Sequence, residues 1–386
     1  MTPAAPDLKP AIYIRHNADL QRLVGRLRGE PLLAVDTESN NLFAYYERVC
    51  LVQLSTRQHD YIIDPLAVSN MAPLGELFAD PRIEIVFHAA EYDIMTLKRD
   101  FHYEFNNLFD TMLAARICGW NAVGLGNILA EQFGVRAEKK YQRADWTARP
   151  LPPEQLLYAQ MDTHYLPELR DRLLAELQET GHLEEAREIF AGLPALPPAE
   201  YVFDPEAYWR IHEARSLRRS QMGLLRALYL LRDDEARRRD VPPFKVFNDS
   251  VLVEIARLSP RRVEDLHGIR GFSQDQVRRY GPKIVQALAE ARREPPPQPP
   301  RRTMSANFDV QARYEALREW RKQRALARGV ESDVILSRDT MWTLARKSPT
   351  TLEDLEQIPG LGPWRRAEYG SELLEVLKQA SRNHDR

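Results

Sequence analysis

The stretch LLAVDTES, residues 32–39, decides the fold of the first part of the chain. Four apolar residues run directly into an acidic pair, Asp36 and Glu38, as at the C-terminal end of a buried central strand. Residues two apart in a strand point to one face, so the two carboxylates lie side by side. Ligands tend to bind at this end of the strands in α/β sheets. The alternative is a polar strand end on a solvent face.

The segments around this stretch predict a central mixed sheet flanked by helices, an α/β or α+β arrangement. Strand-like segments are rich in β-branched or aromatic residues and bounded by turn residues. Besides 32–39 they occupy 49–56, 60–65 and 83–89. Helix-like segments lie around 71–79, 91–101, 110–118, 124–133 and 153–179.

Two further motifs carry acidic residues. HAAEYD (88–93) follows an apolar strand and places Asp93 near the start of a helix. An aspartate at such a position more commonly just stabilises the first turn of the helix than takes part in a functional site. In YAQMD (158–162), Tyr158 and Asp162 stand four apart, so they share one face of a helix. A hydrogen bond between these two side chains is the simpler interpretation of that spacing.

Together, the four acids and the tyrosine predict a metal site. Converging carboxylates resist ionisation unless cations neutralise them, and hard oxygen ligands suit Mg²⁺ or Mn²⁺. Two such ions roughly 3.5–4 Å apart can activate a water and stabilise the leaving oxygen of a phosphoryl displacement. The predicted chemistry is therefore phosphodiester hydrolysis.

Composition limits the class of protein. The 386 residues are 44% apolar and 28% charged, with a mean hydropathy of -0.49, which is typical of a soluble chain of several domains. The N-terminus lacks the features of a secretory signal. Cys50 and Cys118 form no CxxC motif, so we expect a reducing, cytoplasmic location and no zinc site. The sequence has no apolar run of 18 residues, so we expect no contact with a membrane.

The net charge of -2 conceals two unlike halves. Residues 1–200 carry a charge of -10 and residues 201–386 a charge of +8. This division permits a carboxylate site in the first half and a nucleic-acid surface in the second. Proline-rich breaks at 193–205 and 294–300 further predict three domains, whose bounds are 1–192, 205–293 and 303–386.

The basic half contains an internal repeat. Residues 247–273 align without gaps to 336–362 at an offset of 89, which indicates a duplicated, all-helical domain. In each copy we expect Ser259 or Ser348, followed by proline, to cap the start of a helix. Glycine-containing turns, IRGFS and IPGLG, then lead into another helix.

VDTES, HAAEYD and YAQMD resemble the three Exo motifs of the DEDD 3′→5′ exonucleases, in the tyrosine subclass. DWTARPL (145–151) is also similar to that family, and the repeat resembles tandem HRDC domains, an architecture similar to the bacterial ribonuclease D family. The resemblance implies a ribonuclease H-like exonuclease domain followed by two helical bundles. It further implies that four acids hold two metal ions, Mg²⁺ or Mn²⁺, and that Tyr158 positions the attacking water. These acids are Asp36, Glu38, Asp93 and Asp162.

The implied activity is release of 5′-mononucleotides from the 3′ end of RNA, with precursor tRNA as substrate and no obligate protein partner. A DNA exonuclease of the same family and a non-catalytic nucleic-acid adaptor are the alternatives. Ser39 departs from the family pattern next to the acidic pair. Asp110 is expected to cap a helix, and His88 is left outside the catalytic set.

Basic side chains are the candidates for RNA contact. A short run of three precedes DWTARPL, and arginine runs occur in the repeat, where aromatic residues at helical spacing are more typical of core than of base stacking. The short run is Lys139, Lys140 and Arg143. The arginine runs begin at Arg215, Arg237 and Arg321, and the aromatic residues are Tyr208, Trp209, Trp320, Trp342 and Trp364.

Overall fold

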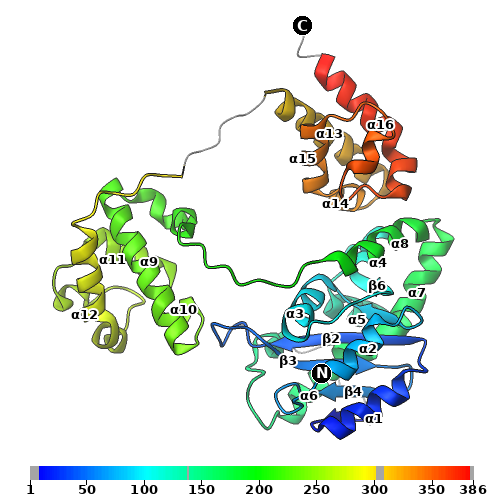
Figure 1. Ribbon diagram of the computed structural model, residues 1–386, viewed down its shortest axis with the longest axis horizontal. Coiled ribbons are helices and arrows are strands. Elements are labelled where there is room, and N and C mark those ends of the chain that lie inside the picture. The colour runs from blue at the N-terminus through cyan, green and yellow to red at the C-terminus, as the bar shows by residue number, and fades with distance from the viewer. Residues whose placement is uncertain (1–7, 137–138, 301–307, 383–386) are drawn as a thin grey trace. The chain divides into compact units, whose positions relative to one another are not determined.

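The strand that carries Asp36 and Glu38, β2 (Leu32–Ser39), lies inside a six-stranded sheet of order β1-β4-β3-β2-β5-β6. The computed structural model describes residues 8–136, 139–300 and 308–382 (Figure 1). The first four residues of β2 are buried and the last four are half-buried, so the acidic pair lies where the strand emerges from the core. The predicted mixed sheet flanked by helices is confirmed.

The sheet combines parallel and antiparallel pairs. β4 is parallel to β1 and antiparallel to β3, whereas β5 is parallel to both β2 and β6. The outer strands β1 and β6 have three residues each and were not predicted, because so short a segment shows no usable alternation. The remaining bounds are β1 (Ile12–Ile14), β3 (Val49–Ser55), β4 (Asp60–Ile63), β5 (Glu84–Phe87) and β6 (Leu108–Asp110).

Helices cover the sheet, and one predicted helix is wrong in extent. The segment 153–179 forms two helices, because Pro167 in the first turn of the second has no N–H to continue the first. The helix before β2 and the one after Gly181 were not predicted. The bounds are α1 (Asn17–Leu27), α2 (Ala72–Ala79), α3 (Glu91–Phe101), α4 (Thr111–Ile117), α5 (Leu125–Phe133), α6 (Pro153–His164), α7 (Leu166–Glu179) and α8 (Leu183–Gly192).

Two clusters of buried side chains hold this part together. The larger one joins the sheet to α1, α2, α3, α4, α7 and α8. The smaller one lies where α6 packs against β3 and β4, and it contains Trp146 and Tyr158. Burial of apolar area at about 25 cal/mol per Å² makes these clusters the main source of stability. Packing in this cluster therefore holds the Tyr158 side chain in place.

The basic half consists of two helical copies in which each main helix recurs 89 residues later. The described residues after 205 contain no strand. The first helical copy comprises α9 (Arg219–Arg239), α10 (Pro243–Val246), α11 (Asp249–Leu258) and α12 (Gln274–Ala291). The second helical copy comprises α13 (Phe308–Arg328), α14 (Ser332–Ile335), α15 (Arg338–Lys347) and α16 (Pro363–Arg382).

The predicted capping role of Ser259 and Ser348 is wrong. Both serines end a helix, with left-handed φ values of 51° and 48°, and donate their N–H groups to Ile255 and Leu344. The turn that follows is capped instead by an aspartate, since Asp265 accepts two backbone N–H groups at 3.0 Å. A serine before proline was thus mistaken for the start of the next element.

The described chain forms two compact units. One contains residues 1–38, 49–199 and 303–386, and the other contains 39–48 and 200–302. The loop after β2 therefore belongs with the first helical copy: the Tyr45 hydroxyl donates to Asp233 at 2.8 Å, and the Tyr45 N–H donates to Asp240 at 3.0 Å. Among the described helices, none is long and apolar enough to cross a bilayer.

Candidate active site

Three of the predicted site residues converge. Asp36 and Glu38 on β2 and Asp162 on α6 each offer a carboxylate oxygen, and the three oxygens lie within 4.8 Å of one another. All three side chains are half-buried. The period of two in β2 places both strand acids on the face that meets α6. A strand end and a helix therefore build one carboxylate cluster from residues 126 positions apart in the sequence.

Asp93 lies in the first turn of α3 and is 8% exposed. The Thr37 hydroxyl donates to its Oδ1 at 2.5 Å, so the residue between the two strand acids holds the fourth acid. Asp93 is outside the group of three mutually close oxygens, yet its charge is felt by Asp36, Glu38 and Asp162.

The cluster resists ionisation. Burial, reinforced by Asp93, raises the pKa of Asp162 to about 8, and burial raises the pKa of Asp93 to about 7. Burial and then repulsion from the other acids raise the pKa of Asp36 and Glu38 well above the usual carboxyl range. The charges that act most strongly on Asp36, Glu38 and Asp162 are those of the other acids. A hard divalent cation is the group that this donor set fits.

Tyr158 lies one helical turn before Asp162 on α6 and is 8% exposed. Burial, followed by the charges of Asp162 and Glu38, raises the pKa of its phenol, so the hydroxyl stays protonated at neutral pH. A protonated phenol donates a hydrogen bond and is no base. Rings of Trp146 and Tyr141 pack around it, with centroids 6.2 and 5.8 Å away.

The segment 145–151 is anchored by an ion pair that sequence reasoning missed. Arg149 contacts Asp64 through two parallel bonds, Nε to Oδ2 at 2.7 Å and Nη2 to Oδ1 at 2.8 Å. The same guanidinium donates to the carbonyls of Trp146 at 2.7 Å and Cys50 at 3.0 Å. Since Trp146 packs on Tyr158, this pair supports the tyrosine from behind. Only the DWTARPL motif signalled it.

Asp110 caps α4 as predicted, and it has a second role. Its Oδ1 accepts the N–H of Met112 at 2.8 Å and of Leu113 at 3.1 Å. It also accepts the N–H groups of Ala89 at 3.1 Å and Ala90 at 2.7 Å, in the turn that leads into α3. Ala89 has a left-handed φ of 65°, a conformation that such bonds hold in place. Asp110 therefore positions the helix that carries Asp93.

His88 lies beside this turn, outside the carboxylate cluster. The Thr111 hydroxyl donates to the Phe87 carbonyl at 3.0 Å, which leaves it to accept from Nδ1 of His88 at 2.9 Å. Burial lowers the pKa of His88 to about 4, so the ring is neutral at physiological pH. It is therefore a structural histidine at the end of β5.

The short basic run forms a 3-10 helix at Lys139–Arg143. Lys140 lies with its ammonium 4.7 Å from the centre of the Tyr141 ring, and Tyr141 is next to Tyr158. Arg143 is exposed. The run thus lies near the tyrosine of the cluster, while its contact with RNA stays a prediction.

The chain matches two family models. Residues 11–178 match a model described as 3′-5′ exonuclease, and residues 221–288 and 310–377 each match the HRDC domain. The first match spans the sheet, the carboxylate cluster and Tyr158. The second and third coincide with the two helical copies, so the internal repeat is a pair of HRDC domains.

Curated and solved relatives agree with these models. Ribonuclease D of Gluconacetobacter diazotrophicus is 34% identical over 95% of this chain and 92% of its own length. The structure of Escherichia coli RNase D aligns with a TM-score of 0.68 at 27% identity, covering 96% of this chain and 99% of that one. The catalytic core of RRP6 from Trypanosoma brucei aligns with a TM-score of 0.69 at 31% identity, covering 75% of this chain and 81% of that one. The chain belongs to the ribonuclease D family of DEDD 3′-5′ exoribonucleases, which are dependent on divalent metal ions.

Proposed function

We propose that this exoribonuclease removes 5′-mononucleotides from the 3′ ends of structured RNAs, with maturation of tRNA 3′ ends as its task. One observation carries the proposal: three acids from β2 and α6 offer carboxylate oxygens that lie within 4.8 Å of one another, a donor set that suits divalent cations. The Escherichia coli relative is described as an exoribonuclease involved in structured RNA processing, which supports this class of substrate.

We assign Asp36, Glu38, Asp93 and Asp162 to a pair of divalent ions, Mg²⁺ or Mn²⁺. Bound there, the ions would activate the attacking water and neutralise charge on the leaving oxygen. The protonated Tyr158 hydroxyl would orient that water by a hydrogen bond. The Asp110 and Arg149 contacts keep Asp93 and Tyr158 in place, which limits the reorganisation needed during reaction.

RNA capture is assigned to the helical part of the chain. We propose domain bounds of 1–192, 205–293 and 303–386. Arg215, Arg218 and Arg219 are exposed, and in the described chain none of them pairs with an acid. A hollow beside them is lined by Trp209, Arg215 and Arg219, a combination suited to a phosphate next to a base. We do not assign the other aromatic residues to base stacking, since Tyr208 lies in one helical core and Trp320, Trp342 and Trp364 pack against the other.

The test compares products from matched RNA and DNA oligonucleotides with free or blocked 3′ ends. We expect Mg²⁺- or Mn²⁺-dependent release of 5′-mononucleotides from RNA with a free 3′ end only. Asp36→Ala and Asp162→Ala should abolish this release while RNA binding survives. Equal cleavage of DNA would favour the DNA exonuclease alternative, and no cleavage by the unmodified chain would favour the adaptor.

Cys50 is buried and Cys118 is half-buried, and the two thiols do not form a disulfide with each other. We therefore keep the expectation of a reducing, cytoplasmic location. Labelling both thiols in protein isolated under non-oxidising conditions and unfolded in a denaturant is the measurement that checks it.

A further inference from the structure

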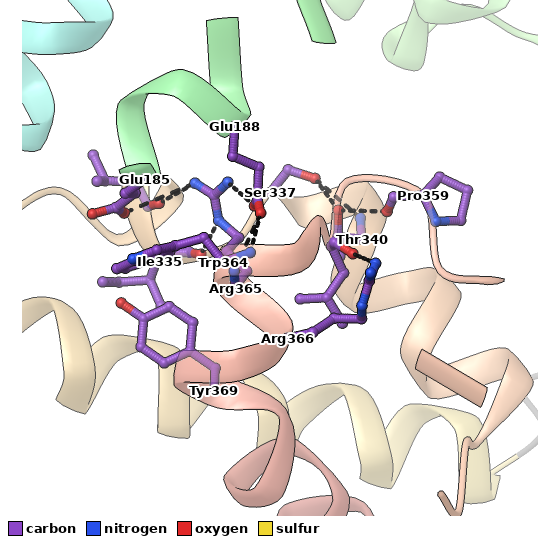
Figure 2. Close-up of polar contacts among 12 residues, drawn as sticks. Glu185, Glu188, Ile335, Ser337, Thr340, Pro359, Trp364, Arg365, Arg366 and Tyr369 are labelled. Atoms are coloured by element: carbon purple, nitrogen blue, oxygen red, sulfur yellow. Dashed lines mark hydrogen bonds and ion pairs between the residues drawn. The ribbon is translucent and has the colours of Figure 1, made fainter. Parts of the chain in front are cut away.

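The second helical copy contacts the exonuclease domain through acids on one face of α8. Glu185 and Glu188 are three residues apart and point toward α13 and α16 (Figure 2). The Glu185 side chain is fully buried and pairs with Arg328 at 2.9 Å and 3.0 Å. A buried carboxylate needs such a partner, because an unpaired one would lose its hydration without compensation. This pair is the first half of the contact.

Glu188 forms the second half by completing the start of α16. Its Oε2 accepts the backbone N–H of Trp364 at 2.6 Å and of Arg365 at 3.3 Å, and its Oε1 accepts from the Arg365 guanidinium at 3.1 Å (Figure 2). The first N–H groups of a helix have no partner within it, so a side chain normally caps them. Here the capping carboxylate comes from another domain.

In the first helical copy, the N–H groups at the start of the equivalent helix, α12, are capped by residues of the same copy. At the position of Gly362 it has Ser273, and at the position of Arg365 it has Gln276. The Ser273 hydroxyl accepts the Gln276 N–H at 3.2 Å, and the Gln276 side chain accepts the Ser273 N–H at 2.8 Å. This is a local capping box, and the residues at the start of α12 are exposed or half-buried.

The replaced residues fit the contact with α8. A Cβ added at Gly362 would overlap the Glu188 carboxyl group, so Glu188 would have to move away from the start of α16. Gln276 reaches the Val246 carbonyl at 2.7 Å, and Arg365 reaches the equivalent Ile335 carbonyl at 3.1 Å but has a second arm for Glu188.

A further difference lies on α14. Asp333 pairs with Arg116 of α4 at 2.5 Å, and the corresponding residue of the first copy is the exposed, uncharged Phe244.

We propose that α8 is a docking site specific for the second helical copy, in which Glu188 serves as a helix cap supplied by the exonuclease domain. Gly362, Arg365 and Asp333 determine the selectivity. The Arg–Tyr pair common to both copies, Arg328 with Tyr369 and Arg239 with Tyr280, does not distinguish them.

Hydrogen–deuterium exchange of the full chain tests the proposal, with Glu188→Ala, Gly362→Ser and the control Glu184→Ala. Glu184 is exposed on α8 and pairs only within that helix, with Arg187. We expect roughly tenfold or faster exchange across 183–192 and 116–120 in both test variants and no change in the control. In Gly362→Ser the serine caps α16 locally, as in the first copy, so the amides of 364–366 stay protected. In Glu188→Ala they exchange faster.

The double variant Glu188→Ala/Gly362→Ser separates a shared contact from two independent ones. If Gly362 acts by admitting Glu188, the double variant should exchange no faster across 183–192 than the faster single variant. Retained cleavage of a short oligonucleotide confirms that the exonuclease domain is folded in each variant. Unchanged protection of 183–192 in Gly362→Ser, or additive effects in the double variant, would overturn the proposal.

Discussion

Arg149 and Asp64 form a bidentate salt bridge beneath the segment that packs on Tyr158, and the Asp64 side chain is 1% exposed. Tyr13 donates to the same carboxylate at 2.7 Å, so Asp64 links strand β1 to the loop that carries Arg149. The position of Tyr158 depends on this contact through Trp146, which is 1% exposed.

Arg149→Ala should therefore lower the free energy of unfolding by about 3–5 kcal/mol, because it leaves a buried carboxylate unpaired. We expect kcat on short RNA to fall as the support of Tyr158 loosens. Arg57→Ala is the control, since its pair with Asp171 is exposed and should contribute at most about 1 kcal/mol. Denaturant titration and single-turnover kinetics measure both effects, and equal losses in the two variants would refute the assignment.

Asp110→Ala should cost about 1–2 kcal/mol of stability for the lost cap and should also reduce kcat, because the turn at 89–90 no longer fixes α3 and Asp93. Asn248→Ala is matched to it, since Asn248 caps α11 by accepting the Val251 N–H at 3.0 Å. That control should lose similar stability and keep its kcat on short RNA. A kcat that falls equally in both variants would show that general destabilisation is the cause.

Tyr158→Phe should lower kcat by about 10²-fold, since the attacking water loses its orienting hydrogen bond. The increase in Tm caused by Mg²⁺ or Mn²⁺ should persist, because the four carboxylates remain. Tyr103→Phe is the control: it is a buried tyrosine whose hydroxyl donates to the Met71 carbonyl at 2.7 Å, within the hydrophobic core. An unchanged kcat in Tyr158→Phe would remove the positioning role.

Acid should destabilise the fold through His88. The unfolded histidine takes up a proton near pH 6.5, whereas burial lowers the pKa of the folded one to about 4. Protonation between these values favours the unfolded chain, so the contribution is full above pH 6.5 and decreases by up to about 3 kcal/mol toward pH 4. The raised pKa values of Asp93 and Asp162 act in the opposite direction over the same range, so the contribution of His88 is the difference between the slopes of the unmodified protein and of His88→Gln in denaturant titrations. Exposed His267→Gln should show no such difference. Identical slopes in all three proteins would contradict the prediction.

Replacing Arg215, Arg218 and Arg219 by alanine should weaken binding of tRNA-like RNA and reduce its salt dependence. Each lost phosphate contact is expected to lower the slope of log K against log salt by about 0.7–0.9. Arg238→Ala is the control, because Arg238 is paired with Glu235 at 2.5 Å. Binding isotherms at several salt concentrations measure the slope, and an unchanged slope in the triple variant would place RNA contact elsewhere.

The carboxylate cluster was accessible from the sequence because its geometry is local. Period two in a strand and a spacing of four in a helix place Asp36 with Glu38 and Tyr158 with Asp162, and the order of apolar segments then suggests that they meet. The supports of the site were not accessible in this way. Asp64 and Arg149 are 85 residues apart, and neither belongs to a periodic pattern that would pair them.

Helix ends and contacts between domains were harder to predict from the sequence than the carboxylate cluster. Ser259 has the residue type of an N-cap, and only its left-handed φ of 51° reveals that it ends a helix. Glu185 and Glu188 stand in a run of acids that is typical of a solvated helix face. Their burial is a consequence of the domain that packs on them, which no local pattern contains.

Because of Gly362, the two HRDC copies differ in how well each can be produced as an isolated domain. The first copy carries its own cap and can be excised between the proline-rich stretches with that helix start intact. If the second copy is cut out at 294–300, it loses the Glu188 carboxylate that caps the start of α16. In an isolated second copy, Gly362→Ser would supply the local helix cap that the first copy has in Ser273. The same substitution would weaken the contact with α8 in the full-length enzyme.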